Sequence, residues 1–229
     1  MVTTELTQTD HDAGITVAAD HTARSGAGSI GTGPDGLSAK FSELVRACQI
    51  APNDPIIAVG DLDAHFVAAL VRAGHRDLTV LHPSKEALGG LREALGDLEA
   101  EVVLTEADPL QFEPHRRYAL WNDRRFFHRL THPDDRQRYV EIVHEALRPE
   151  GHLIISTFGP AGPAEDSGVL VERYSAARLA AELGRQFELV DEGLELHPAV
   201  HGAQHQLLHS RFRRRTPHWP SGPRNGAVR

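Results

Sequence analysis

The chain has 229 residues, of which 40% are apolar, so it is long and apolar enough to bury the core of one ordinary domain. With 24 basic and 32 acidic residues, its formal net charge at pH 7 is -8. A chain this acidic is a poor candidate for holding nucleic acid or an anionic membrane by charge alone. Because Cys48 is its one cysteine, an intrachain disulfide and a cysteine-rich zinc site are both excluded.

The two ends of the chain differ in composition from its middle. Residues 1–35 are rich in Thr, Gly, Ala and Asp without helical or strand periodicity, which predicts a disordered arm. Residues 216–229 contain three prolines and two glycines and predict a loose tail. One domain is therefore expected over residues 36–215. The N-terminus has no signal-peptide pattern, and no apolar run approaches the roughly 20 residues that span a bilayer, so we expect a cytoplasmic protein.

Between these ends, short apolar runs alternate with segments of helical period. Ser84 and Ser175 are expected N-caps, and Pro133 is expected at the first position of its helix. Asp123 and Arg124 are expected to open a helical turn. The patterns predict helices over 37–48, 64–73, 85–95, 133–148 and 176–183, and strands over 55–60, 78–82, 101–105, 118–121, 152–158, 187–193 and 204–212.

The order of these elements indicates the fold class. Short, continuously apolar strands between helices are typical of a parallel sheet covered on both faces. The last two strands have no helix between them, so they are expected to pair antiparallel. The prediction is an α/β protein with a Rossmann-like, doubly wound, seven-stranded sheet, mostly parallel, with an antiparallel C-terminal strand pair. A ligand of such a sheet binds beyond the carboxyl ends of the strands, at the point where the strand order reverses.

Two phrases in the second half of the chain carry a family resemblance. Residues 121–140 read WNDRRFFHRLTHPDDRQRYV, and residues 147–168 read LRPEGHLIISTFGPAGPAEDSG. Together with the strand order, they resemble class I S-adenosylmethionine-dependent methyltransferases. The nearest pattern is a bacterial subgroup that usually reads WHDRAVFHFLTDP, then LRPGGH and IATF. The resemblance covers roughly residues 37–213, and it implies S-adenosylmethionine as cofactor and a small-molecule substrate.

The resemblance assigns cofactor contacts to residues at the predicted strand ends. Gly60 matches the first glycine of the family's cofactor loop, and Asp108 stands where the family's acidic residue accepts a hydrogen bond from the adenine amino group. Trp121 and Asn122 are further candidates for holding the cofactor. For Trp121 the alternative is a core aromatic with no ligand.

Asp123 and His128 are the candidates for catalysis on the substrate side. Asp123 would face the substrate or the amino-acid part of the cofactor, and its alternative is a charge at the start of a helical turn. His128 is alternatively a packed residue. The loop 159–174 is long enough to act as a substrate lid.

The cofactor loop departs from the family pattern. In the stretch PIIAVGDLDAHF, Ala58 stands where an acidic residue is expected, and Leu62 and Ala64 stand where later glycines are expected. Glycines at such positions let the backbone approach a ligand closely. Leu62 instead places a branched side chain in that space.

The end of the second predicted strand departs as well. The family carries Asp or Glu there, whose carboxylate accepts both ribose hydroxyls, whereas this chain has His82. A neutral imidazole accepts one hydrogen bond at a time. Asp61 and Asp63 offer replacement negative charge at the neighbouring strand end. The departures together predict weak binding of S-adenosylmethionine.

Two hypotheses follow. The first is an S-adenosylmethionine-dependent methyltransferase that acts on a small molecule with a weakened cofactor site. The alternative is a catalytically inactive or repurposed protein of the same fold, with a binding or regulatory role. Neither nucleic acid nor a membrane is an expected partner.

Histidines recur every four residues near the C-terminus. On a helix they would share one face and could bind a metal ion, but Pro198 and Gly202 oppose a helix and favour a strand, a turn and a strand. No metal site is therefore predicted. The residues are His197, His201, His205 and His209.

Overall fold

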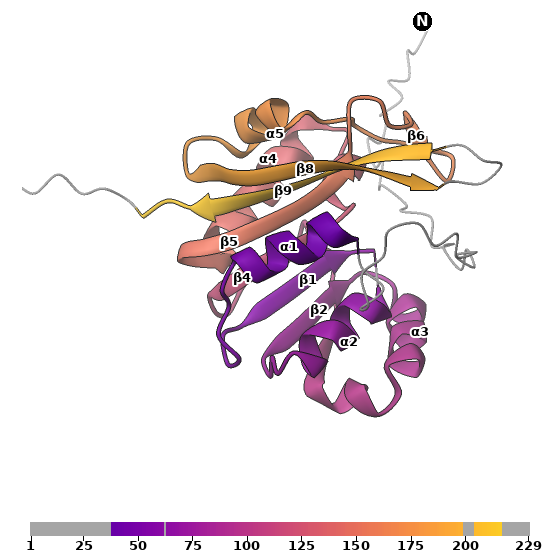
Figure 1. Ribbon diagram of the computed structural model, residues 1–229, viewed down its shortest axis with the longest axis vertical. Helices are drawn as coiled ribbons and strands as arrows, with labels where there is room; N and C mark the ends of the chain where they lie inside the picture. Colours follow the sequence, from indigo (N-terminus) through magenta and orange to yellow (C-terminus); the bar gives the residue numbers. More distant parts are fainter. Residues whose placement is uncertain (1–37, 62, 199–203, 217–229) are drawn as a thin grey trace, which may run out of the picture.

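The computed structural model describes residues 38–61, 63–198 and 204–216 (Figure 1). The arm expected over 1–35 and nearly all of the tail expected over 216–229 lie outside the described residues. The described part forms a seven-stranded sheet in the order β3-β2-β1-β4-β5-β9-β8, flanked by helices.

The bounds of the elements agree with the predicted order. The helices are α1 (Ala39–Ala47), α2 (Ala64–Arg72), α3 (Lys85–Leu95), α4 (Pro133–Ala146) and α5 (Ala176–Leu183), with 3-10 turns η1 (Gly96–Glu101) and η2 (Phe127–Arg129). The strands of the large sheet are β1 (Ile56–Gly60), β2 (Leu78–His82), β3 (Val102–Glu106), β4 (Tyr118–Arg124), β5 (Leu147–Phe158), β8 (Phe187–Pro198) and β9 (Gln204–Arg214). A separate two-stranded ladder joins β6 (Glu165–Asp166) to β7 (Val169–Leu170).

The pairing confirms the predicted fold class. β1 pairs in parallel with both β2 and β4, and β4 pairs in parallel with β5. β9 is antiparallel to both β5 and β8, so the C-terminal strand pair is antiparallel as expected. The strand order reverses between β1 and β4, which is where a ligand of this fold class binds.

The sequence signals for helix ends hold in the structure. The hydroxyl of Ser84 accepts from the backbone N–H of Ala87 at 3.1 Å, and Ser175 accepts from the N–H of Arg178 at 3.2 Å. Pro133 lies at the start of α4 as predicted. α4 ends at Ala146, two residues earlier than expected. The reason is that Arg148 precedes Pro149, which disfavours helical backbone at that position.

The predicted end of β4 is wrong. Asp123 and Arg124 do not open a helical turn, because β4 continues through both of them to pair with Val59 and Gly60 of β1. Their polar side chains suggested that the strand had ended. Asp123 nevertheless lies fully buried in the strand.

The core lies on both faces of the sheet, because alternate residues of a strand point to opposite sides. Leu120 packs with the residues beneath α1, α2 and α3, whereas its neighbour Trp121 packs with those beneath α4 and α5. Figure 1 shows α1 lying over the sheet beside β1 and β4, with α2 and α3 next to it. Across the described ranges, the longest helix has 14 residues, and none is long and apolar enough to cross a membrane.

Candidate functional site

The carboxyl ends of β1 and β4 approach each other closely at the point where the strand order reverses. Gly60 has a φ of +94°, and an added Cβ would collide with the backbone carbonyl of Arg124. The N–H of Asp61 donates to that same carbonyl at 2.8 Å. The glycine expected at the start of the cofactor loop is therefore required here for the contact between two strands.

Four charged side chains from three segments join across this edge, and we call them the edge cluster: Asp61, Arg125, Arg129 and Asp166. The Asp61 carboxylate accepts from Nε of Arg125 at 2.6 Å and lies 3.1 Å from Nη2 of Arg129. Arg129 also donates to Asp166 at 2.9 Å. Because Asp166 belongs to the loop expected to act as a lid, this ion pair ties the loop to the edge.

The other acidic residue of the loop after β1 is also engaged. Asp63 accepts from the N–H of His65 at 2.9 Å and so caps α2. Its second oxygen lies 2.9 Å from Nη2 of Arg124. The Arg124 guanidinium stacks over the ring of Phe41 at 4.8 Å, which fixes its position beside α1. Both carboxylates that could replace the missing cofactor contacts are therefore bound to arginines of the chain itself.

At the end of β2, His82 offers a diol a single ring N–H donor, whereas the carboxylate of the family pattern accepts from both hydroxyls. Its Nδ1 accepts from the N–H of Ser84 at 3.0 Å, and burial lowers its pKa. With Nδ1 as the acceptor, the neutral ring carries its proton on Nε2 and offers a donor. At the end of the next strand, Asp108 accepts from the N–H of Leu110 at 2.9 Å in a local turn.

A buried hydrogen-bonded chain fills the space behind the end of β4. Nε1 of Trp121 donates to the hydroxyl of Tyr139 at 2.9 Å, and that hydroxyl donates to Asp123 at 2.6 Å. Asp123 also accepts from the N–H groups of Phe126 and Phe127 at 2.8 and 3.2 Å. Burial raises the pKa of Asp123 to about 7. In this structure, Asp123 holds the turn after β4 to the core.

Asn122 and His128, the remaining sequence candidates, are fully buried. Both amide atoms of Asn122 lack a hydrogen-bond partner among the described residues. Nδ1 of His128 accepts from the N–H of Phe158 at 3.3 Å, and the two rings stack at 4.8 Å. Burial lowers the pKa of His128 to about 3, so the imidazole is neutral. The structure thus places Trp121, Asn122, Asp123 and His128 in the interior behind the edge.

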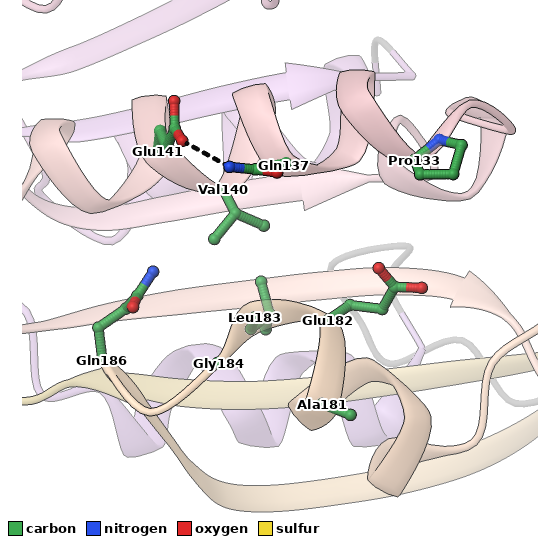
Figure 2. A pocket seen from close by; sticks show the side chains of 9 residues that line it. All are labelled: Pro133, Gln137, Val140, Glu141, Ala181, Glu182, Leu183, Gly184 and Gln186. Carbon is green, nitrogen blue, oxygen red and sulfur yellow. Dashed lines mark hydrogen bonds between the residues drawn. The ribbon is translucent and has the colours of Figure 1, made fainter.

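Two cavities in the described part of the chain have walls that contain no member of the edge cluster. One, of about 450 Å³, lies between α4 and the end of α5 (Figure 2). Its walls are formed by residues within 133–141 and 181–186. The other, of about 480 Å³, lies beside the loop from Pro160 to Arg173. Neither cavity is lined by a residue that the sequence assigned to the cofactor or to catalysis.

Comparison with known proteins identifies the fold. No protein-family model and no curated protein matches the sequence. Among solved structures, the chain is similar to the N-methyltransferase NodS from Bradyrhizobium japonicum WM9, with a TM-score of 0.62, 17% identity and coverage of 77% of this chain and 95% of NodS. It is also similar to a methyltransferase from Mesorhizobium loti, with a TM-score of 0.61, 20% identity and coverage of 80% and 100%.

A third similar structure is the 1,6-didemethyltoxoflavin-N1-methyltransferase from Burkholderia thailandensis, with a TM-score of 0.59, 22% identity and coverage of 78% of each chain. That enzyme was solved with 1,6-didemethyltoxoflavin and S-adenosylhomocysteine bound. These structures show that the chain has the fold of class I S-adenosylmethionine-dependent methyltransferases, as the sequence resemblance implied.

The residues at the edge do not fit S-adenosylmethionine in the way that the resemblance implies. The cofactor carries a cationic sulfonium, a cationic amino group, an anionic carboxylate and a ribose diol, and the resemblance implies carboxylates with unoccupied oxygens for the amino group and the diol. Here Asp61 is bound by two guanidinium groups, and His82 offers a donor. Arg125 and Arg129 were not among the site residues predicted from the sequence. A comparison of residues 121–129 with the family pattern WHDRAVFHF could have identified them, since that pattern has Ala and Phe at these two positions.

Proposed function

We propose that this chain is a methyltransferase-fold protein whose cofactor edge has been rebuilt, and that it is a catalytically inactive or repurposed protein with a binding or regulatory role. The observation that carries the proposal is the position of Asp61 between Arg125 and Arg129. A cationic group of a ligand bound beside Asp61 would be repelled by the guanidinium groups of Arg125 and Arg129. The Asp61 carboxylate, which could attract that group, is already paired with both arginines.

Two departures from the family pattern support rebuilding over random loss, because both contact the same carboxylate of the cofactor loop. Arg125 and Arg129 replace an alanine and a phenylalanine of the family phrase, and both bind Asp61 in the loop that lacks the later glycines. Substitutions that accumulate independently have no reason to meet in one ion-pair cluster.

The second candidate is an S-adenosylmethionine-dependent methyltransferase that acts on a small molecule through a weakened cofactor site. Two observations favour it: Asp108 lies after β3, where the family's adenine contact is expected, and a similar structure is an enzyme with a small-molecule substrate. Under this candidate, the residues that would hold the cofactor are Gly60, Asp61, His82, Asp108, Trp121 and Asn122. Asp123 and His128 would support the substrate side.

Calorimetric titration of the full chain with S-adenosylmethionine separates the two. The sequence lacks the bidentate carboxylate at His82 and a glycine at Leu62, a residue outside the described ranges; each change should cost about 1–3 kcal/mol, which together weaken binding by about 30- to 10⁴-fold. We therefore expect binding far weaker than micromolar. A low-micromolar dissociation constant would contradict the rebuilt-edge proposal and support the methyltransferase.

A further inference from the structure

Three side chains with metal-binding atoms converge on the long hairpin of β8 and β9, away from the edge cluster. Oε2 of Glu195 lies 3.2 Å from Nε2 of His209 and 3.4 Å from Nε2 of His197. All three ligand atoms lie within 4.8 Å of one another. They share one face of the sheet because Glu195 and His197 are two residues apart on β8, and Gly193, two residues before Glu195, pairs with His209.

We propose that Glu195, His197 and His209 form a binding site for a divalent transition-metal ion, with Zn²⁺ as the best-fitting ion. Zinc bound to imidazole nitrogen and carboxylate oxygen at about 2.0–2.2 Å in tetrahedral geometry places neighbouring ligand atoms about 3.3–3.6 Å apart. The two distances from Glu195 agree with such edges. The His197 side chain is 40% exposed, so the fourth position opens to solvent, as in zinc sites that keep a water or a substrate ligand.

The orientation of His209 supports the proposal independently. Its side chain is buried, its Nδ1 lies 2.8 Å from the hydroxyl of Ser156, and its Nε2 has no hydrogen-bond partner among the described residues. When Nδ1 donates to Ser156, the lone pair of Nε2 faces the Glu195 carboxylate. In that tautomer, a metal ion bound by both Nε2 and Oε2 of Glu195 gives each atom a partner.

The carboxylate is held in place from its other side. Oε1 of Glu195 accepts from the backbone N–H of Lys40 at 2.9 Å, which leaves Oε2 directed to the two imidazoles. Hydrogen bonds of this kind to the outer atoms of ligands are typical of metal sites, since they fix the tautomer and the rotamer of each ligand. Ser156 and Lys40 belong to β5 and α1, so three neighbouring strands of the sheet and one helix contribute to this site.

The sequence did not predict this site because the regular spacing of the histidines drew attention to a helix. On the antiparallel pair, His197 faces His205 across the strands, and His209 comes close to Glu195, a residue outside the four-residue repeat. His201 lies outside the described residues. The proposal does not depend on the function proposed for the edge cluster.

The test is zinc binding by the full chain after metal removal with a chelator. Competition with a chromophoric chelator measures affinity, and calorimetry measures stoichiometry. We expect one tight site per chain for Zn²⁺ and none of comparable affinity for Mg²⁺. Glu195→Gln and His197→Gln should each weaken the tight site at least tenfold, whereas His115→Gln, an exposed histidine before β4, should leave it unchanged.

The chain has 15 histidines, so binding by scattered surface imidazoles must be distinguished from the proposed site. X-ray absorption of the one-to-one zinc complex should show two imidazoles, and one fewer in His197→Gln. Ser156→Ala should lower the affinity by about 10- to 100-fold with the fold retained by circular dichroism. Equal zinc affinity in the wild type and all variants, or no binding at micromolar zinc, would overturn the proposal.

Discussion

Replacing Arg125 by Ala and Arg129 by Phe tests whether the edge cluster controls cofactor binding. The double change frees the Asp61 carboxylate and removes two cations from the edge. If each guanidinium lies about 6 Å from a bound cationic group, its repulsion costs about 1 kcal/mol at effective dielectric constants of about 40–80. Two such charges correspond to about 1–3 kcal/mol, so S-adenosylmethionine affinity should rise by about 5- to 150-fold.

The expected loss of stability in this variant is small. The side chains of Arg125 and Arg129 are 36% and 28% exposed, so their ion pairs are screened by solvent. Each contributes about 0.2–1 kcal/mol. Urea unfolding of the variant should confirm that it remains folded before any binding is compared.

Calorimetry with two ligands and one control variant makes the assay specific. S-adenosylhomocysteine lacks the sulfonium charge, so its affinity should rise less than that of S-adenosylmethionine. Arg116→Ala removes an ion pair with Asp77 at the opposite edge of the sheet and should change neither affinity. If the double variant folds and binds S-adenosylmethionine no better than the wild type, the edge cluster is not the cause of weak binding, and our reasoning is refuted.

Two further predictions concern stability. Burial raises the pKa of Asp123 to about 7 and lowers that of His128 to about 3. Because Asp123 binds its proton more tightly in the native protein than in the unfolded chain, its contribution lowers the free energy of unfolding as pH rises from about 4 to 7. Because buried His128 stays neutral, its contribution lowers the free energy of unfolding as pH falls below about 6.5. Urea unfolding between about pH 4.5 and 6.5 measures how the free energy of unfolding changes with pH. Relative to the wild type, this slope should be more positive in Asp123→Asn and less positive in His128→Gln. Slopes equal to that of the wild type would contradict the assigned burial effects. Gly60→Ala should destabilise the protein by about 1–3 kcal/mol more than Gly74→Ala, because both have φ near +95° but an added Cβ at Gly60 alone meets the Arg124 carbonyl. Equal unfolding midpoints for the two variants would show that β1 and β4 can move apart.

Local signals in the sequence determined the order and type of the elements. The strand predicted over 78–82 and the helix predicted over 176–183 have these bounds in the structure. A short apolar run between turn residues and a serine cap before an amphipathic segment are complete within a few residues of chain. The order of the elements also predicted a mostly parallel sheet with an antiparallel C-terminal pair, and the family resemblance agreed with that order.

The tertiary structure decided where β4 ends and what fills the edge. Asn122 and Asp123 are polar, so the sequence placed the strand end before them. Asp123 stays buried in the strand because Tyr139, 16 residues further along the chain, donates a hydrogen bond to its carboxylate. A polar residue can remain in a core when a distant partner satisfies it, and the local sequence does not contain that partner.

The same reason applies to both charged clusters. Asp61 and Arg125 are 64 residues apart, and Ser156 and His209 are 53 residues apart. Composition and spacing show that acidic, basic and imidazole groups are present, but their pairing depends on which strand ends and strand faces the fold brings within a few ångströms. Electrostatic and metal-binding interactions act over such distances in space, so only the tertiary structure could assign Asp61 to two arginines and His209 to Glu195.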